Sequence, residues 1–143
     1  MISYLSEDVS FRFDGKKRLT SAWLRAVARQ ESRQIGDLSV VFCSDPYILS
    51  VNRQYLGHDY YTDIITFDYC EGPVLSGDLI ISVDTVRANA TEYGAASFEE
   101  ELSRVIVHGV LHLVGYDDHT PGDQKLMRQK ENEALALLKS MRV

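Results

Sequence analysis

The pattern of hydrophobic and polar positions along the chain predicts helices alternating with short strands. Apolar residues recur at helical spacing in four segments, at 19–27, 48–55, 86–93 and 126–138. Three short runs rich in β-branched residues are typical of strands, at 38–44, 63–69 and 78–83. The Gly72-Pro73 pair separates the last two runs, so we expect a hairpin-like connection between them.

Several residues indicate where these helices begin, end and face the core. Thr20 is the expected cap of the first helix, and Gly94 should end the helix over 86–93. Thr120 and Pro121 should start the last helix, with Thr as cap and Pro in the first turn. The helix after Pro46 should carry on one side Ile48, Val51, Asn52 and Tyr55. The buried stripe of the last helix should consist of Leu126, Met127, Ala134, Leu135 and Leu138.

A further helix is predicted from Ser97 to Val114. Ser97 and Glu100 fit a capping box, in which the two side chains satisfy free backbone N–H groups. From Val105 onward the helix is apolar on nearly every face, so it should cross the core and end at Gly115. Together these elements predict a single α+β (mixed α/β) domain over residues 1–143. Its small mixed sheet of about four strands should be flanked by helices, with this helix at the centre.

Composition fits a soluble globular domain and excludes several other classes. The 143 residues are 45% hydrophobic and 25% charged, which excludes a disordered or collagen-like chain. No apolar run approaches the roughly 20 residues that span a bilayer, and the N-terminus does not resemble a secretory signal. Cys43 and Cys70 form no C-x-x-C pair and fit reduced, buried thiols. We therefore expect a cytoplasmic protein without a membrane partner.

Charge is distributed unevenly along the chain. The net charge of −6 argues against a nucleic acid held by bulk electrostatics. The first 36 residues are nevertheless rich in basic side chains, namely Arg12, Lys16, Lys17, Arg18, Arg25, Arg29 and Arg33. These side chains form either an ordinary solvated surface or one wall of a groove for single-stranded nucleic acid.

Three of the four histidines lie close together in the sequence, at positions 108, 112 and 119. His108 and His112 lie one turn apart on the predicted core helix, so both imidazoles can reach one metal ion about 2.0–2.1 Å away. Two buried imidazoles without partners would be costly, which disfavours a purely structural pair. Helical zinc proteases carry a Glu base after the first His, and here that residue is Gly109. A peptidase is therefore not expected.

Either Asp118 or His119 could supply a third metal ligand. Three protein ligands would leave a coordination position for water, as in catalytic zinc sites. Both residues together would instead complete a structural site with four protein ligands.

Three ordered blocks of the sequence resemble the bacterial YbeY-type rRNA maturation factors, which are metal-dependent endoribonucleases. Residues 108–119, HGVLHLVGYDDH, are similar to the family pattern H-G-x-L-H-L-x-G-Y-D-H. Residues 52–67, NRQYLGHDYYTDIITF, are similar to N-x-x-Y-R-x-x-D-x-x-T-D-V-L-S-F, and residues 77–82, GDLIIS, to G-D-I-x-I-S. The resemblance implies a small mixed sheet with a central metal-binding helix.

The resemblance also implies an activity, a metal and partners. The activity is single-strand-specific RNA cleavage that matures small-subunit rRNA during ribosome assembly. The partners are single-stranded RNA, rRNA and the small ribosomal subunit or its associated proteins. The metal is one Zn²⁺ or another divalent transition ion, held by His108, His112 and Asp118, since Asp118 occupies the position of the family's third ligand. Asp117 and His119 are then the candidates for general acid and base in metal-assisted phosphodiester cleavage.

Leu56 departs from the family pattern, which has an Arg thought to contact RNA phosphate. A bidentate guanidinium is lost there, and Arg53 or Arg104 are candidates to replace it. Thr62 and Asp63 either line the site or form a turn at the start of a strand. Two other functions stay open, a non-catalytic ribosome assembly factor with a structural zinc and a metallohydrolase of another phosphoester.

Overall fold

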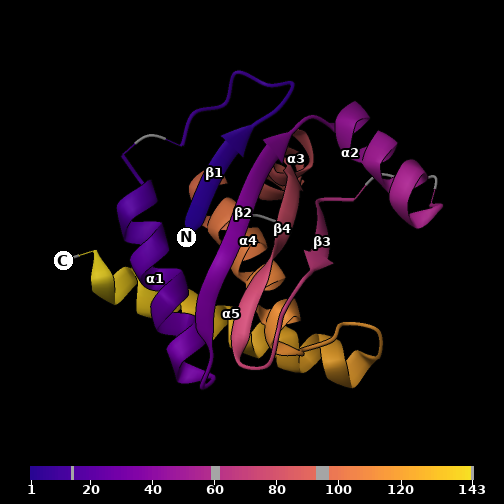
Figure 1. The fold of residues 1–143 in the computed structure, drawn as a ribbon. Coiled ribbons are helices and arrows are strands. Elements are labelled where there is room, and N and C mark those ends of the chain that lie inside the picture. The colour runs from indigo at the N-terminus through magenta and orange to yellow at the C-terminus, as the bar shows by residue number, and fades with distance from the viewer. Residues whose placement is uncertain (14, 59–61, 93–96, 143) are drawn as a thin grey trace.

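The structure, a computed structural model, describes residues 1–13, 15–58, 62–92 and 97–142 (Figure 1). Four strands of the described residues form one sheet in the order β1-β2-β4-β3. Their bounds are Ile2–Ser6 for β1, Gln34–Cys43 for β2, Ile64–Asp68 for β3 and Val74–Ser82 for β4. β1, β2 and β4 are parallel, whereas β3 is antiparallel to β4. The small mixed sheet and the hairpin-like connection are therefore as predicted.

Helices cover both faces of this sheet. One face packs against α1 (Lys17–Gln30), α3 (Val83–Glu92) and α4 (Phe98–Val114), and α5 (Pro121–Met141) packs on α4 and α1. The other face packs against α2 (Asp45–Val51), which continues into the π-helical turn η1 (Asn52–Leu56). The alternation along β2 explains the two layers, since Val40 and Phe42 face the larger cluster while Val41 and Cys43 face α2.

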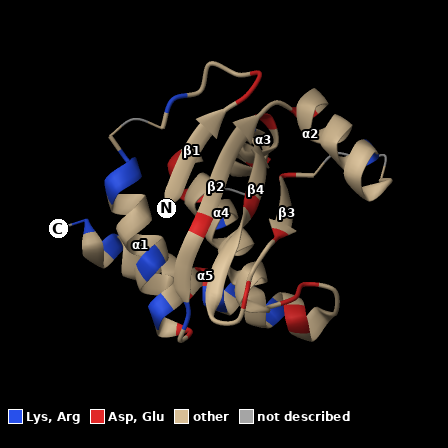
Figure 2. Ribbon diagram, viewed as in Figure 1, with Lys and Arg blue, Asp and Glu red and all other residues tan. Residues whose placement is uncertain are grey.

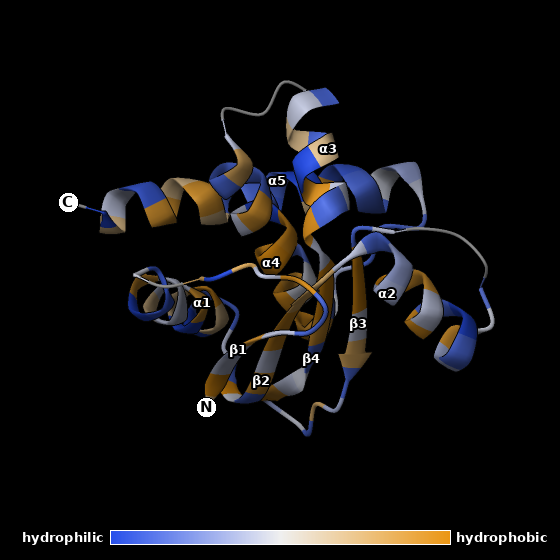
Figure 3. Ribbon diagram, turned by 90° about the horizontal axis from the view of Figure 1, so that it is seen from above, coloured by the Kyte–Doolittle hydropathy of each residue, from blue (hydrophilic) through white to orange (hydrophobic). Residues whose placement is uncertain are grey.

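Helix α4 lies at the centre of the larger layer, between the sheet and α5, and Figure 3 shows it as strongly hydrophobic. Gly109 allows α4 to approach the sheet closely. A Cβ atom at this position would lie 2.8 Å from Ile64 Cδ1 and 2.8 Å from Leu79 Cδ2. The close approach holds the histidine-bearing turns of α4 beside β3, so the fold itself positions the candidate site.

The predicted helix signals are partly confirmed. The Oγ of Ser97 accepts a hydrogen bond from the backbone N–H of Glu100 at 3.0 Å, and Thr120 caps α5 in the same way. The expected cap at Thr20 is wrong, because α1 begins at Lys17 and Thr20 is buried within it. The expected helix end at Gly94 lies outside the described residues. Thus capping chemistry was informative for α4 and α5 but not for α1.

Two predicted positions are wrong: Tyr55 does not lie on the same side as Ile48, and Leu126 is not buried. Tyr55 is 63% exposed because the chain enters the wider π-helical turn at Asn52, which rotates the following residues away from the face that buries Ile48. Leu126 is 42% exposed at the edge of the stripe on α5, whereas the other predicted stripe residues are buried. Strand β1 was not predicted at all.

Both cysteines are free thiols. Cys43 is fully buried as expected, but Cys70 is only half-buried. Within the described residues, no helix combines the length and the hydrophobicity needed to cross a bilayer.

Candidate metal centre

Helix α4 presents two imidazoles from the same face near its C-terminal end. The ring centroids of His108 and His112 lie 4.6 Å apart with an interplanar angle of 81°. Each ring is partly accessible, although the helix around it is buried. The spacing of four residues therefore places the two rings together as the sequence indicated.

The connection between α4 and α5 brings a carboxylate back to these imidazoles. Gly115 ends α4 with a φ of 126°, a conformation that L side chains rarely adopt. The Nε2 atom of Gln124 then donates to the backbone carbonyl of Asp118 at 3.1 Å, which fixes the end of the turn to α5. As a result, the Oδ2 atom of Asp118 lies 3.4 Å from His108 Nε2 and 3.5 Å from His112 Nε2.

The three side chains fit a small metal ion. One ligand atom from each of His108, His112 and Asp118 lies within 4.8 Å of the others. A tetrahedral ion with bonds of about 2.0–2.1 Å separates its ligand atoms by about 3.4 Å. The two nitrogen-to-oxygen distances of 3.4 and 3.5 Å match that separation. Two imidazole nitrogens and one carboxylate oxygen suit a divalent transition metal.

A buried carboxylate that the sequence analysis did not identify orients the first histidine. Glu131 of α5 is 5% exposed, and its Oε2 atom accepts from His108 Nδ1 at 2.7 Å. Its Oε1 atom accepts from Arg104 at 3.0 Å. A proton on Nδ1 leaves the lone pair of Nε2 directed at Asp118 and the candidate metal position. An acidic residue on the otherwise apolar stripe of α5 was the signal that could have revealed this role.

The electrostatics of this group follow from burial and from ion pairing. Burial alone would lower the pKa of His108, but the hydrogen bond and charge of Glu131 outweigh it and raise that pKa. Burial would likewise raise the pKa of Glu131, but the bonds from His108 and Arg104 lower it. Burial also raises the pKa of Asp63, which faces the same group. Glu131 is therefore a fixed negative charge beside the candidate metal position.

The two predicted acid–base residues lie together at the exposed end of the site. The Nε2 atom of His119 lies 3.1 Å from Asp117 Oδ1, and the side chains are 80% and 57% exposed. His119 also belongs to a second group of possible ligands with Asp117 and Asp118, at the solvent side of the connection. The structure thus groups Asp118 with His108 and His112, and it groups His119 with Asp117.

An open cavity of about 460 Å³ surrounds these side chains, and we call it the histidine cavity. Its walls come from η1, β3, the C-terminal part of α4 and the α4–α5 connection. Thr62 and Asp63 both line it, so the interpretation of these residues as part of the site is supported by their position. The arrangement can accept a substrate at the point where the two imidazoles and Asp118 converge.

Comparison with known proteins identifies the family. The family model described as Endoribonuclease YbeY matches residues 1–139. The chain belongs to the YbeY endoribonuclease family. It is 54% identical to the protein named Endoribonuclease YbeY of Bacteroides thetaiotaomicron, over 95% of this chain and 98% of that protein. The same name is given to a Phocaeicola vulgatus protein that is 54% identical over 96% of this chain and 99% of its own length.

A solved structure shares the fold of this YbeY family member. The solution structure of a protein from Thermotoga maritima superposes with a TM-score of 0.68 and is 30% identical in sequence. The match covers 96% of this chain and 89% of the other. The mixed sheet with a central helix is therefore shared with an experimentally determined structure.

The histidine cavity of this family member is lined by no Lys or Arg among the described residues. Leu56, at the position where the family pattern has Arg, is 45% exposed and lines the cavity. Arg104, one candidate to replace that Arg, is instead bonded to buried Glu131. Arg53, the other candidate, is not among the lining residues. Residues 59–61 of the same sequence block lie outside the described part of the chain.

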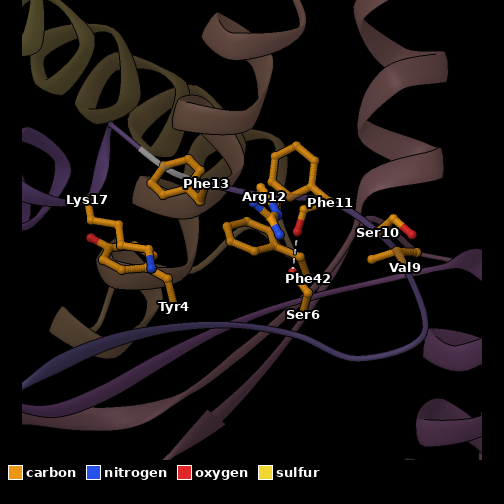
Figure 4. Close-up of a pocket in the computed structure, with 9 residues that line it drawn as sticks. All are labelled: Tyr4, Ser6, Val9, Ser10, Phe11, Arg12, Phe13, Lys17 and Phe42. Atoms are coloured by element: carbon orange, nitrogen blue, oxygen red, sulfur yellow. Dashed lines mark hydrogen bonds between the residues drawn. The ribbon is translucent and has the colours of Figure 1, made fainter.

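No residue of the basic helix α1 lines the histidine cavity. The interpretation of its basic side chains as one wall of a groove at this site is therefore wrong. Figures 1 and 2 show the basic positions of α1 at the β1 side of the sheet, while the site lies beside β3. A separate cavity of about 430 Å³ lies at the β1 side (Figure 4). Phe11, Phe13 and Phe42 pack on one another there, with Arg12 and Lys17 at its wall. It contains no metal-ligating residue among those that line it.

Proposed function

We propose that this chain is a metal-dependent, single-strand-specific endoribonuclease that acts in rRNA maturation. Membership of the YbeY family supports an RNA-cleaving hydrolase. The observation that carries the proposal for this chain is the convergence of His108 Nε2, His112 Nε2 and Asp118 Oδ2 on one point of an open cavity. Such a point suits a metal that faces a substrate.

His108, His112 and Asp118 would hold one Zn²⁺, and another divalent transition metal would suit the same donors. When bound, such an ion polarises a phosphoryl oxygen and lowers the pKa of a coordinated water molecule. His119 is turned to Asp117 at 3.1 Å and not to the two imidazoles of α4. Three protein ligands favour a catalytic site over a structural one with four.

The remaining residues orient the ligands and move protons. Glu131 holds the Nδ1 proton of His108, so that the ring cannot turn its other nitrogen away from the site. We assign proton transfer to Asp117 and His119, which share a contact at the solvent side of the histidine cavity. The carboxylate of Asp117 keeps a proton on the facing nitrogen of His119, so the other ring nitrogen can accept a proton from the attacking water. The imidazolium formed in this way can then return that proton to the ribose oxygen that leaves.

The proposed partners are single-stranded RNA, rRNA and the small ribosomal subunit or its associated proteins. The net charge of −6 repels free RNA, and no Lys or Arg lines the histidine cavity in the described residues. RNA that is presented by a ribosomal particle would not depend on long-range attraction to the protein. This favours a substrate within an assembling subunit.

The test is cleavage of a labelled single-stranded RNA by the zinc-loaded protein and by its His112→Ala variant. Gln129→Ala, an exposed position on α5, is the matched control. Zinc content and circular dichroism are measured for each sample, and the same RNA annealed to its complement tests strand specificity. We expect the parent and the control to cleave the single strand, and His112→Ala to lose activity at least about 100-fold because one of three ligands is gone.

Equal cleavage by the parent and His112→Ala would overturn the proposed function. Loss of the fold in His112→Ala would instead support a structural zinc, the assembly-factor alternative. His119→Ala separates the proton-transfer assignment from metal binding, since it should retain zinc and fold but lose cleavage.

A further inference from the structure

The histidine cavity is electrostatically unsuited to hold a phosphodiester chain by itself. Its lining residues in the described chain include Asp63, Asp68, Asp117 and Asp118, without any Lys or Arg. An RNA strand on this side alone would bring its phosphates next to carboxylates. Any cation for the strand besides the metal ion itself must therefore lie elsewhere around the metal position.

A second cavity, of about 570 Å³, opens on the other side of the same ligands, and we call it the α5 cavity. It shares His108 and Asp118 with the histidine cavity, so both lead to the same point. Its remaining walls come from the first three turns of α5 and include Lys125, Arg128 and the buried Glu131. Figure 2 shows basic positions in this part of α5 beside the acidic α4–α5 connection.

Lys125 and Arg128 are placed to act together. They are three residues apart on α5 and therefore lie on one face of the helix. Both are exposed, and the side chain of Arg128 is 63% accessible. Gln124 lies on the same wall, where its amide nitrogen donates to the backbone carbonyl of Asp118. Two cations on one face can bind the oxygens of adjacent phosphates.

Arg128 is not required to neutralise the buried carboxylate below it. The Nη1 atom of Arg128 lies 3.6 Å from Glu131 Oε1, which is beyond a good hydrogen bond. The same oxygen already accepts from Arg104 at 3.0 Å. The guanidinium of Arg128 can therefore turn to a substrate without leaving Glu131 unsatisfied.

We propose that Lys125 and Arg128 form a phosphate-binding subsite of the endoribonuclease, which holds the RNA strand as it leaves the metal position along α5. This subsite supplies the cation that Leu56 cannot. The inference rests on the proposed function, because it assumes that an RNA phosphate is bound at His108, His112 and Asp118. The strand then crosses from the histidine cavity to the α5 cavity over the shared ligands.

The test uses the zinc-loaded protein with Lys125→Gln, Arg128→Gln and the double variant. Lys139→Gln is the matched control, because it removes one exposed positive charge from the same helix far along the chain from the subsite. The kcat and KM for a labelled single-stranded RNA are measured over a range of KCl concentrations. We expect KM to rise with kcat changed less than twofold. The slope of log(kcat/KM) against log[KCl] should become shallower by about 0.7 for each single variant and about 1.4 for the double variant.

RNAs with one neutral methylphosphonate linkage locate the contact. A single such linkage beside the cleavage site should raise KM for the parent and for Lys139→Gln, but should have no further effect on the double variant. If the double variant keeps the parent's KM and salt slope while the parent cleaves, the subsite is overturned and the proposed function stands. If the parent does not cleave RNA at all, both are overturned. A fall in zinc content with an unchanged salt slope would also overturn the subsite, since it would mean that Arg128 only supports Glu131.

Discussion

The substitution Glu131→Gln tests how the protein prepares His108 for a metal. Glu131 offers one oxygen to His108 Nδ1 at 2.7 Å and the other to Arg104 at 3.0 Å. Gln has nearly the same shape but only one acceptor oxygen, and its NH₂ group must face one of these two donors. If the amide nitrogen faces His108, the ring must carry its proton on Nε2, the atom that would bind the metal. If it faces Arg104, a half-buried guanidinium loses its acceptor.

The expected effect has two parts. Loss of a hydrogen-bonded carboxylate behind a ligating His weakens metal binding about 10- to 100-fold, or about 1.4–2.7 kcal/mol. In the metal-free protein, the loss of one charged hydrogen bond at a residue that is 5% exposed lowers the free energy of unfolding by about 1–3 kcal/mol. The side chains of Arg104 and His108 are 18% and 21% exposed, so solvent screening favours the lower half of that range.

Zinc affinity is measured by competition with a chromophoric chelator, and stability by urea unfolding of the metal-free protein. Glu133→Gln is the matched control, since Glu133 lies on the same helix, is 54% exposed and touches Lys130 rather than the site. If the zinc dissociation constants of Glu131→Gln and Glu133→Gln differ by less than about threefold, the orienting role of Glu131 is refuted.

Three further predictions concern the stability of the fold. Gly77→Ala should lower the free energy of unfolding by about 1–3 kcal/mol in urea, because the new Cβ would overlap the backbone carbonyl of Phe67 and push β3 from β4; an unchanged midpoint would contradict this packing. Trp23→Phe should lower the free energy of unfolding by about 1–3 kcal/mol in the same assay, because Trp23 Nε1 donates at 2.7 Å to the carbonyl of Ala134. A urea midpoint equal to that of the parent would argue against the contribution of this hydrogen bond. Burial raises the pKa of Cys43 to about 12, so the folded state keeps a proton that the unfolded state releases above about pH 9. Above this pH, the free energy of unfolding should therefore fall by up to about 1.4 kcal/mol per pH unit. Cys43→Ala should lack this part of the decline, and parallel urea midpoints of parent and variant between pH 8 and 10 would contradict it.

Local sequence signals predicted which side chains lie together at the centre of the candidate site. The spacing of His108 and His112, the turn at Gly115 and the caps of α4 and α5 all act over a few residues, so their physical meaning is visible in the sequence. The strands β2, β3 and β4 were predicted for the same reason. β2 and β4 each begin four residues before the predicted start and end one residue earlier than predicted, and β3 is one residue shorter at each end. The position of Asp118 beside both imidazoles follows from that same short connection.

Long-range contacts explain what sequence analysis missed. Strand β1 is a short edge strand that pairs in parallel with β2, so no turn signals it and its burial does not alternate. Glu131 meets His108 only because α5 packs across α4. The basic helix α1 lies beside β1, whereas the site lies beside β3 at the opposite edge of the sheet. This separation depends on the strand order, which composition cannot reveal.

The candidate ligands His108, His112 and Asp118, and the carboxylate of Glu131 that orients His108, all lie within residues 108–131. This segment consists of the end of α4, a short connection and the first half of α5, and it includes no strand. In a chain whose sheet has not yet formed, His108, His112 and Asp118 therefore stay close together, because few residues separate them. Their effective concentration with respect to one another is far above that of three separate ligands. Zinc should then bind the unfolded ensemble measurably. The ion would stabilise the native protein by less than its native affinity implies, and it would favour early pairing of α4 with α5 during folding.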